Sequence, residues 1–236
     1  MRLRIMYSLS PELKFLGNLD TLRMLARCLR RARVPFALSE GFNPHIKMSL
    51  GTVLPVGIWS EGEWLDLDLT ESMPADEVIL RMNSAAPGGL HFIKAEYIEA
   101  NIPTLMSIVD SACYCFEIAG LEAAPEVIES IEGLDSKDHL KVQSRGKQKD
   151  KVKDLAPGVY RIKYQQIEPN RAVIYAWVAS GSVFNVRPDE LMEILNPLLN
   201  PGRIIDCYRK GNYIKIEGEF KLPVKETFTS KEQAGA

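Results

Sequence analysis

The sequence predicts an α+β protein made of two consecutive βαββαβ units, each built on an antiparallel sheet. Short runs in which apolar and polar residues alternate, as they do in strands, are separated by segments with the three-to-four spacing of helices. The order strand-helix-strand-strand-helix-strand is predicted in the first half of the 236 residues, and the second half comes near it with an extra strand. This is the order of the ferredoxin-like fold, so we predict tandem ferredoxin-like domains. A hydrophobic content of 46% is enough for two cores.

The first unit is expected over residues 1–100. Its strands are predicted at 2–8, 47–54, 63–69 and 90–97. One helix follows a cap at Asp20 or Thr21, and Pro74 opens another that ends near residue 84. Alternating leucine and aspartate in 65–69 gives the third strand an acidic outer face.

The second unit is expected over residues 111–223, after a linker at 101–110. Its strands are predicted at 111–119, 140–142, 160–164, 172–178, 204–208 and 213–216, and its helices at 125–131 and 187–195. Residues 168–170 would turn a hairpin between two of these strands. A basic, mobile loop is expected at 144–153, and a flexible tail at 224–236.

The first helix carries an unusual group of arginines. Its apolar residues recur at helical spacing and predict one buried face: Leu22, Leu25, Leu29 and Ala32. The arginines fall on the other side: Arg23, Arg27, Arg30 and Arg31. Asp20 is the only acid from residue 13 to 39, so these arginines lack the carboxylates that usually accompany an exposed helix. They form either a solvated face or a binding surface for an anion, and guanidinium groups suit phosphate well.

A Gly-Phe-Asn-Pro-His loop follows this helix. Gly41 permits a backbone geometry that other residues resist, and Phe42 is expected in the core rather than on a base-stacking surface. His45 and Lys47 lie two residues apart in an extended run, so both should face the same side. His45 is either structural, simply exposed, or a general acid or base. Further candidate anion or RNA contacts are Lys14, Asn43, His45 and Lys47.

These motifs resemble a known family. The combination K-F-L-x-x-L-D, an Arg-rich helix and G-F-N-P-H-x-K-x-S is similar to the bacterial radical-SAM-linked (radical-SAM-associated) proteins, over about residues 1–70. That family is a domain of unknown function encoded beside, or fused to, a cobalamin-binding-type radical SAM protein. The resemblance therefore implies a radical SAM protein as partner. Gly17 and Asn18 depart from the family pattern, which commonly has Ser-His there.

Charge is distributed unevenly behind the formal net value of −2. Residues 1–50 carry nine Lys and Arg against three acids, residues 51–140 three against seventeen, and residues 141–236 seventeen against eleven. Five cations lie in the basic loop: Arg145, Lys147, Lys149, Lys151 and Lys153. That loop is either a solvated hairpin tip or an arm that follows phosphates, and the acidic stretch is a possible docking face for a protein.

Several classes of site have no sequence signal. The four cysteines are scattered, and no C-x-x-x-C-x-x-C is present to hold a radical SAM cluster, so we expect no metal and no cofactor. Cys113 and Cys115 should face one side of a sheet. G-x-G-x-x-G and the Walker phosphate loop are absent. No apolar run suits a membrane span or a signal peptide, so the expected location is cytoplasmic.

Three functions are compatible with these patterns. The first is an accessory or substrate-recognition protein of a radical SAM enzyme that binds RNA, such as tRNA or rRNA, through its basic surface. The second is a stand-alone RNA-processing endonuclease that uses His45. The third is a protein-interaction module that docks its partner through the acidic face around Glu61, Glu63, Asp66 and Asp68.

Overall fold

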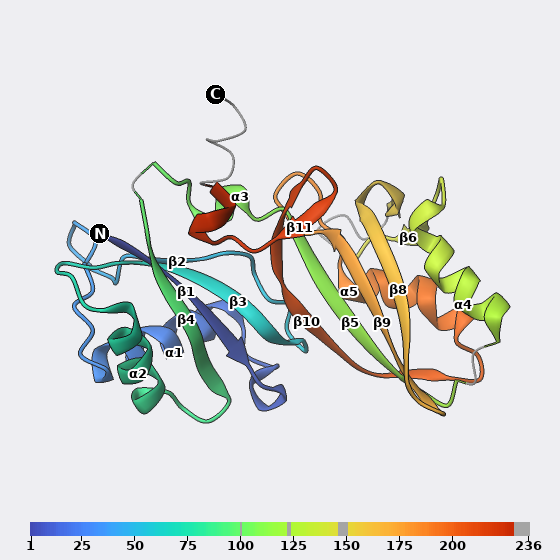
Figure 1. Ribbon diagram of the computed structural model, residues 1–236, viewed down its shortest axis with the longest axis horizontal. Helices are drawn as coiled ribbons and strands as arrows, with labels where there is room; N and C mark the ends of the chain where they lie inside the picture. Colours follow the sequence, from blue (N-terminus) through green and yellow to red (C-terminus); the bar gives the residue numbers. More distant parts are fainter. Residues whose placement is uncertain (100, 122–123, 146–150, 229–236) are drawn as a thin grey trace. The chain divides into compact units, whose positions relative to one another are not determined.

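We analysed a computed structural model that describes residues 1–99, 101–121, 124–145 and 151–228 (Figure 1). The chain divides into two units. Unit 1 contains residues 1–109 and 211–236, and unit 2 contains residues 110–210. The boundary therefore differs from the predicted one, since the last part of the chain returns to the first unit. One long strand, β10 (Arg203–Ile216), contains the second boundary.

Unit 1 has the predicted element order βαββαβ at its start. Its elements are β1 (Arg2–Leu9), η1 (Pro11–Leu13), α1 (Asn18–Arg31), β2 (Met48–Leu50), β3 (Trp59–Asp68), α2 (Ala75–Ala85), β4 (Leu90–Ile98), α3 (Leu105–Ile108) and β11 (Glu219–Lys221). The strands run in the order β4-β1-β3, and β2 pairs with β3. The β1–β3, β1–β4 and β2–β3 pairs are all antiparallel.

Both long helices of unit 1 pack on the same face of its sheet (Figure 1). The apolar side of α1 supplies Leu25 and Leu29, and α2 supplies Met82, to a core that also contains Ile5 and Leu65 from the sheet. These side chains are completely buried. Burial of each such side chain contributes about 1.5–3 kcal/mol, which explains why the arginines of α1 are left on the solvent side.

The opposite face of this sheet is also covered, contrary to the predicted acidic outer face. Trp64 of β3 packs with Leu105, Val109 and Val224, which come from the predicted linker and the predicted tail. Asp66 is therefore only 4% exposed. Apolar residues of the predicted linker and of the predicted tail thus cover this second face of the sheet.

The buried charged pair on that second face has hydrogen-bond partners, whereas the buried Trp64 Nε1 has none among the described residues. Arg4 forms a bidentate pair with Asp66, and its guanidinium also donates to the carbonyl oxygens of Pro103 and Pro223. Glu63 alternates with Trp64 and so lies on the helix-covered face, like Leu65 and Leu67, where it is 2% exposed. Its carboxylate accepts hydrogen bonds from Ser60 at 2.6 Å and Asn212 at 3.2 Å. Glu63 and Asp66 are thus structural groups, and they are not part of an acidic docking face.

Unit 2 combines a larger antiparallel sheet with a small separate one. Its elements are β5 (Ser111–Ala119), α4 (Pro125–Glu132), η2 (Gly133–Ser136), β6 (Lys141–Gln143), β7 (Val152–Asp154), η3 (Ala156–Gly158), β8 (Val159–Glu168), β9 (Arg171–Ala179), α5 (Pro188–Leu195), η4 (Asn196–Leu198) and the first part of β10. The main order is β10-β5-β9-β8, and β6 pairs with β7 alone. The hairpin predicted across residues 168–170 is present between β8 and β9. Residues 152 and 153, predicted in a loop, lie in β7.

Candidate functional site

The outer side of α1 forms one wall of a cleft in unit 1. Thr21, Leu25, Cys28 and Leu29 are the buried residues of the helix, which leaves its arginines exposed. The cleft has a volume of about 490 Å³. It is lined by Leu13, Leu16, Asp20, Arg23, Met24, Arg27, Arg31 and Pro87. Three of the four predicted arginines therefore share one cleft, whose remaining wall is mostly apolar.

Helical spacing explains which arginines of α1 line this cleft. Arg23, Arg27 and Arg31 follow one another at intervals of four residues, so they form one stripe that rises about 6 Å per step. Arg30 lies off this stripe, and its guanidinium is 6.0 Å from the ring centre of Phe36. Arg30 does not line the cleft.

The cleft has excess positive charge. Arg23 forms an exposed ion pair with Asp20 at 3.3 Å, which has little energetic weight in water. Within the described parts of the chain, the side chains of Arg27 and Arg31 form no hydrogen bond or ion pair. Neither residue therefore has an acidic partner among the described residues, although Asp20 lines the same cleft. An anion would meet two guanidinium groups whose donors have no partner in the described protein.

The loop between α1 and β2 is closed by Ser39 and His45. The Ser39 backbone N–H donates to the His45 carbonyl at 2.8 Å, and the His45 N–H donates to the Ser39 hydroxyl oxygen at 3.1 Å. The His45 ring nitrogen Nδ1 lies 2.9 Å from the same hydroxyl oxygen. Gly41 has a φ of 115°, as the turn requires.

Exposure in this loop differs partly from the prediction. Phe42 is fully exposed, so the expectation that it belongs to the core was wrong. The neighbouring residues 40, 41, 43, 44 and 45 are exposed as well, so this part of the loop lies at the surface. His45 and Lys47 are exposed on either side of buried Ile46, as predicted for an extended run. Asn43 is exposed as well. His45 lines neither the α1 cleft nor the second cavity of unit 1 described next.

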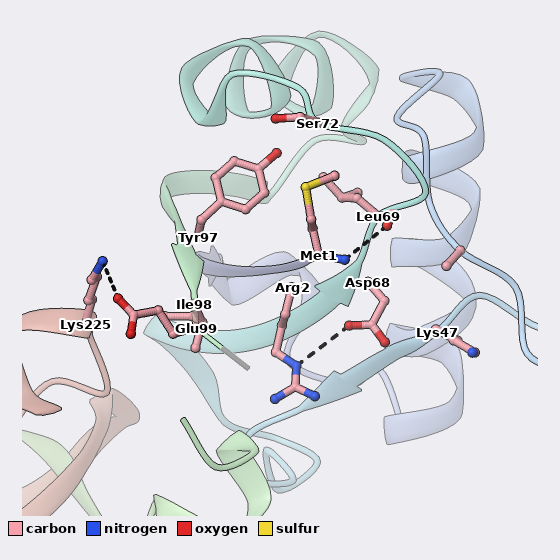
Figure 2. Close-up of a pocket in the computed structure, with 11 residues that line it drawn as sticks. Met1, Arg2, Lys47, Asp68, Leu69, Ser72, Tyr97, Ile98, Glu99 and Lys225 are labelled. Carbon is pink, nitrogen blue, oxygen red and sulfur yellow. Dashed lines mark hydrogen bonds and ion pairs between the residues drawn. The ribbon is translucent and has the colours of Figure 1, made fainter. Parts of the chain in front are cut away.

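A second cavity lies in unit 1, at the ends of the strands β3 and β4 and the start of β1. Figure 2 shows its lining side chains. Its volume is about 740 Å³. It is lined by Met1, Arg2, Ala37, Lys47, Asp68, Leu69, Ser72, Tyr97, Ile98, Glu99 and Lys225. Of the predicted anion contacts, only Lys47 is found here.

Lys14, the remaining predicted contact of unit 1, lines neither cavity. Its ammonium nitrogen is 5.6 Å from the ring centre of exposed Phe15. Lys14 and Phe15 lie between Leu13 and Leu16, which belong to the α1 cleft, so this cation and ring are close to the cleft in the chain.

The basic loop of unit 2 is partly neutralised by α5. Arg145 forms an ion pair with Glu193 at 3.1 Å, and Lys153 forms one with Glu190 at 2.7 Å. Glu190 is completely buried, and it also accepts a hydrogen bond from the backbone of Arg187 at the start of α5. These two cations thus have acidic partners within unit 2. The predicted contacts Lys147 and Lys149 lie outside the described residues.

Some lining residues of both cavities had no signal in the sequence. Leu13, Leu16 and Pro87 join the arginines only through the fold, because η1 and the turn before β4 meet the outer side of α1. Arg2 and Lys225 are likewise brought together from opposite ends of the sequence. The alternation of residues in β1 predicted that the Arg2 side chain points away from the core. No local pattern predicted that Lys225 lines a cavity.

Membrane-spanning helices and metal-ligand clusters are both absent from the described part of the chain. No helix there has the length and apolar character needed to span a membrane. Among the same residues, no three His, Cys, Asp or Glu side chains gather as metal ligands. The predicted pair Cys113 and Cys115 is buried in β5.

Comparison with solved structures gave two weak likenesses. The first is a Cbf5-Nop10-Gar1 complex, with a TM-score of 0.47 and 10% identity over 87% of this chain and 47% of the other. The second is the archaeal box H/ACA sRNP Nop10-Cbf5 complex, with a TM-score of 0.41 and 11% identity over 87% and 46%. The chain thus spans about half the length of these proteins. TM-scores below 0.5 do not establish a shared fold.

Comparison of the sequence with curated proteins found no match. A sequence family described as "Uncharacterized protein conserved in bacteria (DUF2344)" matches residues 2–188. This range contains α1 with its arginines, the loop that Ser39 and His45 close, and most of unit 2. Since this match covers most of the chain, the chain belongs to the DUF2344 family of bacterial proteins.

Proposed function

We propose that this protein binds RNA through the outer side of α1, with Arg23, Arg27 and Arg31 contacting phosphates. The observation that carries this proposal is the stripe of three arginines along one cleft, two of which have no acidic partner in the described protein. An ordinary solvated helix face would have carboxylates at i,i+4. Unpaired guanidinium groups favour a ligand with several negative charges, because each group forms bidentate bonds to phosphate oxygens.

The composition of the cleft favours a nucleic acid over a simple anion. Leu13, Leu16 and Met24 give the cleft an apolar wall beside the arginines. Sugar and base groups would pack on that wall, and the phosphates would face the guanidinium groups. The formal net charge of the chain is −2, so attraction of a polyanion depends on local basic surfaces such as this cleft.

We also propose that this protein is an accessory or substrate-recognition protein of a radical SAM enzyme, and that the RNA it binds is a tRNA or an rRNA. The support for this partner is the sequence resemblance of residues 1–70. The chain would present the RNA, and the partner would perform the chemistry. We also assign both units to the ferredoxin-like fold. Supporting this assignment are the pairing of β2 with β3 beside the order β4-β1-β3, and the order β10-β5-β9-β8 in unit 2.

The endonuclease alternative receives less support from the surroundings of His45. The ring contacts the Ser39 hydroxyl, and no acidic or basic side chain among the described residues forms a hydrogen bond or ion pair with it. His45 also lines neither cavity of unit 1. General acid–base catalysis needs a positioned group within hydrogen-bond reach of a bound substrate.

Fluorescence anisotropy with a pool of short RNAs tests the proposal. The triple variant Arg23→Gln, Arg27→Gln and Arg31→Gln should weaken binding by at least about tenfold, because each lost charged hydrogen bond is worth about 1.5–3 kcal/mol. A control variant removes three exposed cations of unit 2: Lys137→Gln, Lys163→Gln and Arg203→Gln. It has the same net charge as the test variant.

The two variants separate local binding from general charge. If the control retains wild-type affinity and the test variant loses it, α1 is the RNA-binding surface. Equal losses in both variants, or no binding by the wild type, would reject the proposed site. A thermal unfolding curve for each variant checks that the fold is unchanged, as expected for exposed side chains.

A further inference from the structure

We propose that the second cavity of unit 1, shown in Figure 2, binds a nucleoside monophosphate, either free or as the 5′ end of an RNA. This site is distinct from the α1 cleft, since the two share no lining residue. The inference goes beyond the proposed function and does not depend on it. Its argument rests on the charges, the ring and the size of the cavity.

The charged lining calls for an anionic ligand. Lys225 is neutralised by Glu99 at 2.8 Å, which also raises the pKa of Lys225. The Lys47 ammonium has no ion-pair partner among the described residues. A phosphate is a suitable partner for a lysine, which binds it as a point charge.

Arg2 adds further donors beside Asp68. Its Nε lies 3.7 Å from the Asp68 carboxylate, and its NH1 donates to the Ile102 carbonyl oxygen at a long 3.4 Å. Both distances are longer than the roughly 2.7–3.2 Å of a normal hydrogen bond, so the guanidinium retains capacity for a ligand. In Figure 2, Asp68 lies beside Arg2, to which its ion pair connects it. Its carboxylate offers acceptors for hydroxyl groups such as those of a ribose, and Ser72 lines the same cavity.

A fixed aromatic ring completes the site. The Tyr97 hydroxyl donates to the Met73 carbonyl oxygen at 2.7 Å and accepts from the Met73 N–H at 3.0 Å. Both bonds hold the ring in place before any ligand arrives. Leu69 and Ile98 provide apolar surface in the same cavity. A flat base can pack on such a ring, as bases do on aromatic side chains.

Size decides against smaller anions. A volume of about 740 Å³ lies within the roughly 300–1,000 Å³ typical of sites for drug-sized ligands. Inorganic phosphate or a small amino acid would leave most of this space empty. A nucleoside monophosphate combines the negative charge, the hydroxyl groups and the flat apolar body that the lining side chains suit.

Isothermal titration calorimetry with adenosine and uridine 5′-monophosphates tests this site. Both should bind, and adenosine should bind at least about tenfold more weakly, because it lacks the charge that Lys47 contacts. Lys47→Gln should reduce monophosphate affinity about tenfold and leave adenosine affinity unchanged. Since Lys47 has no partner to lose, this variant should fold normally. Lys141→Gln, an exposed cation of unit 2, is the matched control.

Two further arms identify the source of the ligand and keep the two proposals apart. A 5′-phosphorylated tetraribonucleotide should outcompete its 5′-hydroxyl form if the ligand is an RNA end, and neither should compete if it is a free nucleotide. The triple arginine variant of α1 should bind monophosphates normally. No monophosphate binding at millimolar concentration, or equal affinity in Lys47→Gln and wild type, would overturn the inference and leave RNA binding by α1 untouched.

Discussion

Arg4 and Asp66 form a buried bidentate pair on the second face of the unit 1 sheet. Arg4 Nε lies 2.7 Å from Asp66 Oδ1, and Arg4 NH2 lies 2.9 Å from Oδ2. Arg4 NH1 donates to the Pro223 carbonyl oxygen at 3.0 Å, and Asp66 accepts a long bond of 3.4 Å from the Leu105 N–H. The pair therefore connects β1 and β3 to two segments that lie far away in the sequence.

Removal of one member should strongly destabilise the protein. Asp66→Ala leaves the Arg4 charge buried without its partner, and such changes typically cost about 3–5 kcal/mol. Urea unfolding followed by circular dichroism measures this loss. The double variant Arg4→Met with Asp66→Leu is the control and should recover most of the stability, since it leaves no buried charge. A loss below about 1 kcal/mol in Asp66→Ala would show that water replaces the carboxylate.

The β6–β7 hairpin should have an acid-sensitive link at Asp154. His139 Nδ1 lies 2.6 Å from its carboxylate, and together with the backbone N–H groups of Leu140 and Ala156 it lowers the pKa of Asp154 from 3.8 to about 2. Because the folded-state pKa is lowered, the associated stability is present above pH 3.8 and is lost as the pH falls through about 2.

Carboxyl NMR titration of His139→Ala tests this link. The pKa of Asp154 should rise toward 3.8, because the histidine is the largest cause of its depression. His91→Ala, which removes an exposed histidine of unit 1, should leave the Asp154 pKa unchanged. An unaltered pKa in His139→Ala would assign the depression to the backbone bonds alone.

The cysteines should react slowly in the native protein. All four are buried. A contact with Cys115 and burial raise the pKa of Cys113, and burial raises the pKa of Cys28 and of Cys207. Since the thiolate is the reactive form, a disulfide reagent at pH 8 should label these thiols slowly until urea unfolds the chain. The exposed position in Ser182→Cys should be labelled at once and serves as control. Rapid native labelling of more than that one site would contradict this account.

The helix that carries the candidate site was predictable from local pattern. The spacing of Leu25 and Leu29 placed the arginines on the solvent side, and the structure agrees. The start of the helix differed, since it begins at Asn18 after Gly17, whereas the predicted cap was Asp20 or Thr21. Thr21 is buried and belongs to the helix. The periodicity of apolar side chains predicts the buried face of a helix more accurately than it predicts the residue at which the helix begins.

The environment of β3 was not predictable from its own residues. Alternation of Leu65 and Leu67 with Asp66 normally indicates one solvated face. Here the second face is covered by segments around Pro103 and Pro223, and Arg4 supplies the matching charge. No local pattern reports such distant contacts. The same reason explains why Val224, expected in a flexible tail, is packed against Trp64.

The salt dependence of RNA affinity tests the central claim most directly. Each phosphate contact on single-stranded RNA contributes about −0.7 to the slope of log affinity against log salt concentration. The variant Arg27→Gln with Arg31→Gln should therefore have a slope less steep than wild type by about 1.4, and Arg203→Gln with Lys163→Gln should match wild type. Parallel slopes for the α1 variant and the wild type would show that these arginines contact no phosphate.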